Sequence, residues 1–163
     1  MARIAVRPRA ADDLPACVAV LRATHEVNGY PAIWPHDPSR WLTSANTDAA
    51  AWVATVDGAI RGHIAAIAED FTGTHEPPAL SIVRLFVHPA IRGGGVGAAL
   101  VGEALDYARA NGRRPALEVA DSGVAAIRLY ERLGWRRVAA READWTEPDG
   151  HRPTVYDYVL DAT

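Results

Sequence analysis

Four glycines stand within five positions in the segment RGGGVGA, residues 92–98, between an apolar run and a helical pattern. Glycine is costly to order, and it adopts backbone dihedral angles that other residues avoid, so this cluster indicates that the backbone must approach something closely. The first turn of a helix has N–H groups without partners and a partial positive charge, which together bind phosphate. The segment therefore predicts a diphosphate-binding loop made of Arg92, Gly93, Gly94, Gly95, Val96, Gly97 and Ala98.

Two other phosphate-binding motifs do not fit this loop. A P-loop needs Gly-x-x-x-x-Gly-Lys-Ser/Thr, and the chain contains no lysine. A dinucleotide fingerprint needs Gly-x-Gly-x-x-Gly, which Ala98 and Leu100 break. A tight turn is the remaining interpretation, but a turn needs one or two glycines rather than four.

The elements around the loop alternate between strand and helix patterns along the 163 residues. Residues 80–87 are dense in apolar residues and predict a central strand, whereas residues 96–112 have helical periodicity. Asp57-Gly58 predicts the turn of a β-hairpin. The expected order is β-α-loop-β-β-β-α-β-α-β-β, which predicts one α/β domain over residues 1–163 with a mixed sheet.

Composition excludes several classes of function. The net charge of −3 disfavours a nucleic acid partner, and no apolar run is long enough to span a membrane. One cysteine cannot form a disulfide within the chain, which fits a reducing compartment, and no export signal is visible, so we expect a cytoplasmic protein. The histidines are scattered, so we expect no metal site.

Two segments resemble motifs of the GNAT superfamily of N-acetyltransferases. LFVHPAIRGGGVGAALVGEAL is similar to the family's acyl-CoA signature, in which Val-x-Pro precedes Arg/Gln-x-x-Gly-x-Gly/Ala and a helix. ALEVADSGVAAIRLYERLGWRRV is similar to a second motif, Ala-x-x-Leu-Tyr-x-x-x-Gly-Phe/Trp. Together they cover residues 80–138, and the element order of the chain is also similar. The matching residues are Arg92, Gly95, Gly97, Ala126, Leu129, Tyr130, Gly134 and Trp135.

The resemblance implies a fold and a cosubstrate. The fold would be a single GNAT-like domain with a mixed, mostly antiparallel sheet that is splayed between two central strands and flanked by helices. We expect the splay after Val87, because Pro89 ends that strand. The cosubstrate would be acetyl-CoA, with its diphosphate on the amides of residues 92–98 and no metal. Its pantetheine arm would pair with the strand end at Leu85, Phe86 and Val87.

The resemblance also implies an acid, Tyr130, which would protonate the departing thiolate. The alternative is a core aromatic residue at helical spacing. A base matters more, because a lysine-like amine with a pKa of ~10.4 is only ~10⁻³ neutral at pH 7. Many members carry a glutamate a few residues before LFV, where this chain has Ser81, Ile82 and Val83, and an asparagine where it has Gly123.

These departures leave several candidates for the base. Glu118, on the neighbouring strand, is the first, because burial would raise the pKa of its carboxyl group toward a useful range. A cross-strand ion pair is an equal alternative for Glu118. His25, His88 and a chain of water molecules follow.

The acceptor site is expected on the first helix and the proline-rich loop after it. An aromatic wall there would stabilise a cation, and polar residues would add contacts. The alternative is a hydrophobic cluster that closes the core. The residues are His25, Glu26, Tyr30, Trp34 and Trp41.

The sequence thus predicts an acetyl-CoA-dependent N-acetyltransferase acting on a primary amine of a small molecule. An amino acid, a polyamine, an amine-bearing antibiotic and a protein N-terminus all stay open as acceptors. The alternative is a catalytically weak acyl-CoA-binding module that senses CoA or regulates a partner. Pairing as a homodimer is also left open.

Overall fold

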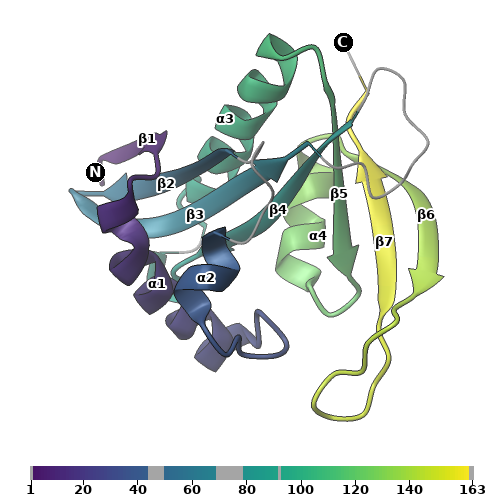
Figure 1. The fold of residues 1–163 in the computed structure, drawn as a ribbon. Helices are drawn as coiled ribbons and strands as arrows, with labels where there is room; N and C mark the ends of the chain where they lie inside the picture. Colours follow the sequence, from purple (N-terminus) through teal and green to yellow (C-terminus); the bar gives the residue numbers. More distant parts are fainter. Residues whose placement is uncertain (1, 44–49, 69–78, 92, 162–163) are drawn as a thin grey trace.

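A seven-stranded sheet forms the centre of the computed structural model, which describes residues 2–43, 50–68, 79–91 and 93–161 (Figure 1). The spatial order is β1-β2-β3-β4-β5-β7-β6, and among these strands only β4 and β5 pair in parallel. The sheet is therefore mixed and mostly antiparallel, which confirms the predicted fold class. The strands are β1 Ile4–Pro8, β2 Ala50–Val56, β3 Ala59–Ile67, β4 Ala79–Val87, β5 Arg114–Ala120, β6 Arg136–Glu142 and β7 Thr154–Val159.

Helices cover both faces of this sheet (Figure 1). On β2, Trp52 belongs to a core cluster with residues of α3 and α4, whereas Val53 packs with residues of α1 and α2. Successive strand residues point to opposite faces, so the two helix pairs lie on opposite sides. None of the described helices is long and apolar enough to cross a membrane. The helices are α1 Leu14–Asn28, α2 Pro38–Thr43, α3 Val96–Ala110 and α4 Val124–Arg132.

Local sequence signals explain where several elements begin and end. Asp57 and Gly58 both have positive φ values, 51° and 87°, which is the geometry of the predicted hairpin turn between β2 and β3. Asp37 begins α2, because its Oδ1 accepts a hydrogen bond of 3.1 Å from the backbone N–H of Arg40. Gly112, with a φ of 63°, follows the end of α3 in the left-handed conformation that is common after a helix.

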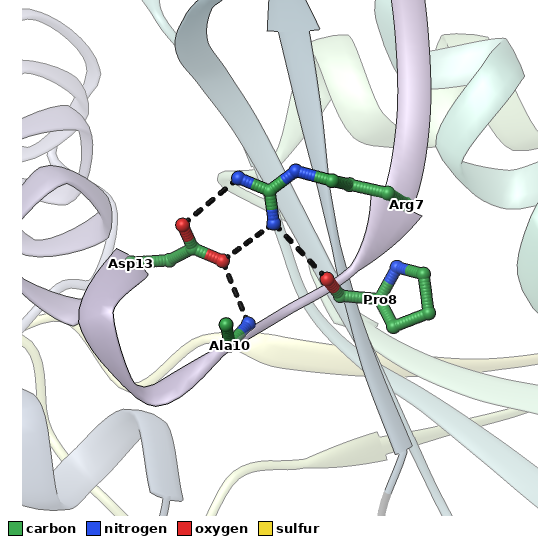
Figure 2. Close-up of polar contacts among 4 residues, drawn as sticks. All are labelled: Arg7, Pro8, Ala10 and Asp13. Carbon is green, nitrogen blue, oxygen red and sulfur yellow. Dashed lines mark hydrogen bonds and ion pairs between the residues drawn. The ribbon is translucent and has the colours of Figure 1, made fainter.

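A bidentate ion pair joins β1 to the start of α1 (Figure 2). The Arg7 guanidinium donates to both carboxylate oxygens of Asp13, at 2.7 and 2.9 Å, and the backbone N–H of Ala10 donates to Asp13 Oδ2 at 2.7 Å. The hydrogen bonds from Arg7 and Ala10 lower the pKa of Asp13 from 3.8 to about 2. The first strand is thereby fastened to the helix that follows it.

An extra residue in β4 bends this strand beside its neighbour. His63 of β3 pairs with Phe86 but Ala65 pairs with Val83, so β4 carries one residue more than β3 over this stretch. Arg84 lies in this bulge with a φ of 52°, a left-handed conformation that non-glycine residues rarely adopt.

The sheet splays between β4 and β5, but not where the sequence analysis placed it. Pairing between the two strands runs from Ala79 and Arg114 to Ser81 and Ala116 and stops there, although both strands continue. They start side by side and diverge toward their C-terminal ends (Figure 1). The expected position after Val87 is therefore wrong: β4 parts from β5 after Ser81, and the bulge against β3 at Arg84 lies between this point and Val87.

Candidate active site

A cleft of about 1210 Å³ opens beside the diverging strands β4 and β5. Segments that are far apart in the chain form its walls: the loop after α1, α2, β4, β5, the N-terminal part of α4, and the connection between β6 and β7. The wall residues with functional groups or large rings include Tyr30, Trp41, Arg84, Glu118, Tyr130 and Trp145.

The structure brings together some of the predicted site residues and not others. Tyr30, Trp41, Leu85, Phe86, Glu118 and Tyr130 line the cleft. The lining does not include His25, Glu26, Trp34, Val87 or residues 93–98. Arg92 lies outside the described residues.

The glycine loop has the open backbone that a diphosphate requires. Gly93 and Gly95 have φ values of 83°, all three residues 93–95 are exposed, and an added Cβ at Gly93 or Gly95 would have no neighbour within 4 Å. Gly95 is the N-cap of α3 and has no side chain to cap the helix, so the amides of its first turn are open to a ligand. An added Cβ at Gly97 would come within 3.0 Å of Leu129 Cδ2. These residues fit a diphosphate, since they offer N–H groups and no bulk.

Tyr130 lines the cleft from α4. This residue is 5% exposed, and within the described parts of the chain its hydroxyl group makes no hydrogen bond. Burial raises the pKa of Tyr130 well above 10.0, and the neighbouring Tyr30 acts in the same direction. The hydroxyl group therefore keeps its hydrogen at neutral pH and can donate it into the cleft.

Glu118 lies in the cleft wall with one oxygen engaged. Its Oε1 is 2.7 Å from Nη2 of Arg141, which reaches across β7 from β6. Asp157 is its cross-strand neighbour on β7. The distance to Arg141 thus supports the interpretation of Glu118 as an ion-pair partner, and Glu118 also lines the cleft.

The two histidines considered as bases do not line the cleft, and each has a local hydrogen bond. His25 Nδ1 is 2.7 Å from the carbonyl oxygen of Pro31, and its ring lies 5.2 Å from that of Trp34. His88 Nδ1 accepts a hydrogen bond of 3.1 Å from the backbone N–H of Ala90. Of the three side chains considered, only Glu118 lines the cleft.

The aromatic residues of the loop after α1 serve two surfaces. Tyr30, Trp34 and Trp41 pack on the core cluster around Cys17. This agrees with the alternative given in the sequence analysis, a hydrophobic cluster that closes the core. Tyr30 and Trp41 also line the cleft, with their ring centres 6.4 Å apart. Trp34 instead lies beneath the guanidinium of Arg22, at 4.6 Å.

Sequence reasoning missed a fully buried histidine, His63, that supports the bulge. Its Nδ1 is 2.9 Å from the Arg84 carbonyl oxygen, which can only accept, so Nδ1 carries the hydrogen. Nε2 then accepts from Arg9 Nη1 at 2.9 Å, and the ring stacks on Phe86 at 4.9 Å. Burial lowers the pKa of His63 from 6.5 to about 4. The signal in the sequence was a lone histidine within the apolar run GHIAAI, residues 62–67.

Sequence reasoning also missed Arg84. Its Cζ lies 4.8 Å from the centre of the Trp41 ring, in the wall of the cleft. The signal was the one charged residue in the apolar run LSIVRLFV, because a charge in a central strand needs a reason to be there.

No three histidine, cysteine, aspartate or glutamate side chains gather as metal ligands in the parts of the chain that the structure describes. Cys17 is buried, and burial raises the pKa of its thiol to about 11, so it stays protonated at neutral pH.

Comparisons with known proteins agree on one family and one fold. The model of the acetyltransferase (GNAT) family matches residues 18–135. An uncharacterized N-acetyltransferase of Methanocaldococcus jannaschii is 32% identical over 103 residues, which are 63% of this chain and 45% of that protein. The chain thus spans about half the length of this relative.

Solved structures share the fold at lower identity. The ribosomal-protein-S18-alanine N-acetyltransferase from Escherichia coli superimposes with a TM-score of 0.76 at 21% identity, over 97% of this chain and 93% of that one. Arabidopsis thaliana NAA60 in complex with acetyl-CoA gives a TM-score of 0.74 at 20% identity, over 97% and 98%.

Proposed function

The chain belongs to the acetyltransferase (GNAT) family, and from this we propose that it transfers an acetyl group from acetyl-CoA to a primary amine of a small molecule. The observation that carries the proposal is the cleft beside the splayed strands, which Tyr130 lines. We propose further that residues 1–163 act as one domain. Bound acetyl-CoA would supply the activated acetyl group as a thioester.

The acyl donor is assigned here to the glycine loop and to the C-terminal end of β4. We place the diphosphate on the open amides of residues 93–98 with the Arg92 side chain, and the pantetheine arm along Leu85, Phe86 and Val87. Support for the second placement is that β5 pairs with β4 only as far as Ser81, so the later β4 residues are not paired with β5. An arm that runs as an added strand would use that edge.

Two side chains take the proton-handling roles in this proposal. Tyr130 donates its hydroxyl hydrogen to the sulfur atom that leaves. Because burial raises the pKa of this hydroxyl group above that of the departing thiol, ~8.5, its contribution is a hydrogen bond that stabilises the thiolate rather than complete proton transfer. Glu118 accepts the proton of the amine, directly or through water, while Arg141 keeps its ion pair with Oε1 of this carboxylate.

Release of free thiol from acetyl-CoA in the presence of single amines tests this function. We expect release that depends on one class of amine and scales with its concentration. Calorimetry with CoA gives the second measurement: Gly97→Asp should weaken CoA binding by about 10²-fold or more through its negative charge, whereas Gly97→Asn, which has the same bulk beside Leu129 and no charge, should weaken it less. Gly102→Asp, on the same helix with no atom within 4 Å of its Cβ, is the control and should leave the affinity unchanged.

The possible results separate the two functions. CoA binding without thiol release for any amine would favour the acyl-CoA sensor over the enzyme. Equal CoA affinity in Gly97→Asp and the wild type would contradict the placement of the diphosphate.

A further inference from the structure

A buried histidine donates a hydrogen bond to the strained residue of the β4 bulge. His63 is fully buried on β3, and Arg84 on β4 has a φ of 52°, a conformation that a non-glycine residue keeps only where its surroundings require it. His63 Nδ1 donates to the Arg84 carbonyl oxygen at 2.9 Å. The bond is thus made at the residue whose backbone needs support.

Two neighbours fix the His63 ring in one protonation form. The Arg84 carbonyl oxygen can only accept a hydrogen bond, and the Arg9 guanidinium, 2.9 Å from Nε2, can only donate one. Both contacts require the hydrogen atom on Nδ1 and none on Nε2. Arg9 also donates to the Leu42 carbonyl oxygen at 3.1 Å, and the His63 ring stacks on Phe86. The donor to the bulge is therefore held in its orientation.

The bulge determines which backbone groups of β4 face the edge toward β5. The backbone N–H of His88 donates to the Arg61 carbonyl oxygen at 2.7 Å, so His88 is directed toward β3. Backbone groups of successive strand residues alternate between the two edges, so those of Val87 face the other edge, where β5 pairs only as far as Ser81. Without the extra residue, the pairing would slip by one position and direct Phe86 to that edge instead.

Resting on the proposed function, we infer that His63 is a positioning residue for the acyl donor: it holds the bulge and thereby directs the backbone of Val87 toward the pantetheine arm. His63 does not line the cleft, so it acts through the Arg84 backbone and not by contact with acetyl-CoA. A histidine that only filled the core could be replaced by an apolar side chain of similar size without loss of affinity for CoA.

Calorimetry with two probes tests this inference. The probes are CoA and ADP, which shares the adenosine diphosphate of CoA and lacks the arm. His63→Leu removes the donor and should weaken CoA binding by about 10-fold while ADP binding stays unchanged. His63→Asn places an amide donor where Nδ1 stands and should keep the affinity for CoA within about 3-fold of the wild type.

Arg84→Gly provides an independent test, because glycine adopts a left-handed conformation without support. In this background the bulge no longer needs its histidine donor, so adding His63→Leu should change the affinity for CoA by less than about 3-fold. The Arg84→Gly single variant is the reference, since both proteins lack the same side chain.

A stability control separates positioning from a general loss of packing. Val159, fully buried on β7 and outside the cleft lining, provides it: Val159→Ala should lower the Tm and leave the affinity for CoA unchanged. If His63→Leu does not fold, His63→Gln takes its place, because its amide reaches the position of Nε2 and not that of Nδ1.

Three outcomes would overturn the inference. His63→Leu may bind CoA as tightly as the wild type does, it may weaken CoA and ADP by the same factor, or it may weaken CoA equally with and without Arg84→Gly. None of these results affects the proposed function, which thiol release with single amines decides. A wild type that binds no CoA would contradict the proposed function, and the inference would fall with it.

Discussion

Acidification should destabilise the protein through one buried side chain, His63. Its ring is enclosed by Phe86 and by two cations, Arg9 and Arg84, and its Nε2 already accepts a hydrogen bond from Arg9. A proton added to Nε2 would break that bond and place a third positive charge beside the other two. The folded state therefore binds this proton more weakly than the unfolded chain, whose histidine has an ordinary pKa of 6.5.

The two pKa values set both the pH window and the size of the effect. The stabilisation by neutral His63 is complete above pH 6.5 and is lost as the pH falls to about 4, the pKa in the folded state. Over this window the free energy of unfolding should fall by about 1.4 kcal/mol per pH unit, which reaches about 3 kcal/mol at pH 4. Below pH 4 this contribution stays constant.

Urea unfolding followed by tryptophan fluorescence between pH 7.5 and pH 4 measures this loss. Asparagine at position 63 can still donate to the Arg84 carbonyl group and does not titrate. His63→Asn should start about 2 kcal/mol less stable at pH 7.5, because the smaller side chain leaves a cavity, and should lose about 3 kcal/mol less on acidification. His36→Asn, at an exposed position, is the control and should follow the wild type. If the free energy of unfolding falls equally with pH in His63→Asn and in the wild type, the reasoning is refuted.

Three further predictions concern proton transfer and stability. Tyr130→Phe should lower kcat by about 10²-fold with little change in the KM for acetyl-CoA, and an unchanged kcat in steady-state assays would exclude its role. Glu118→Gln should remove the acidic limb of the pH profile of kcat/KM, whereas Arg141→Gln should keep it. The same loss in both variants would mean that the ion pair alone matters. Asp13→Asn should lower the Tm at pH 7 by about 2–4 °C, and this difference should disappear as the pH falls from 4 to 2, where the Asp13 carboxylate itself becomes protonated; a difference that persists at pH 2 would exclude the ion pair with Arg7 as its cause.

Local signals predicted the elements well because each depends on a few neighbouring residues. Asp57-Gly58 permits the positive φ values of a tight hairpin wherever it stands in a fold, and the glycine loop before α3 is defined by its own backbone. The order of strands and helices therefore followed from the chain alone.

The position of the splay and the contents of the cleft depend on contacts between distant residues. Arg84 takes a left-handed conformation because His63 of the neighbouring strand holds its carbonyl group and Arg9 holds His63. None of these relations appears in the residues next to Arg84. Trp34 and Trp41 stand seven residues apart in one aromatic and proline-rich segment of the sequence, yet Trp41 lies in α2 and lines the cleft, whereas Trp34 precedes this helix and does not.

Side chains of α1 hold the backbone of the loop that follows this helix. The Thr24 hydroxyl group donates to the carbonyl oxygen of Tyr30 at 3.1 Å, and His25 binds that of Pro31 at 2.7 Å. Positions 32 and 33, which follow directly and line the cleft, can therefore change identity without loosening this anchor. These two positions suit saturation mutagenesis. A library that varies both would change which amine is accepted and leave the residues proposed to bind acetyl-CoA unchanged.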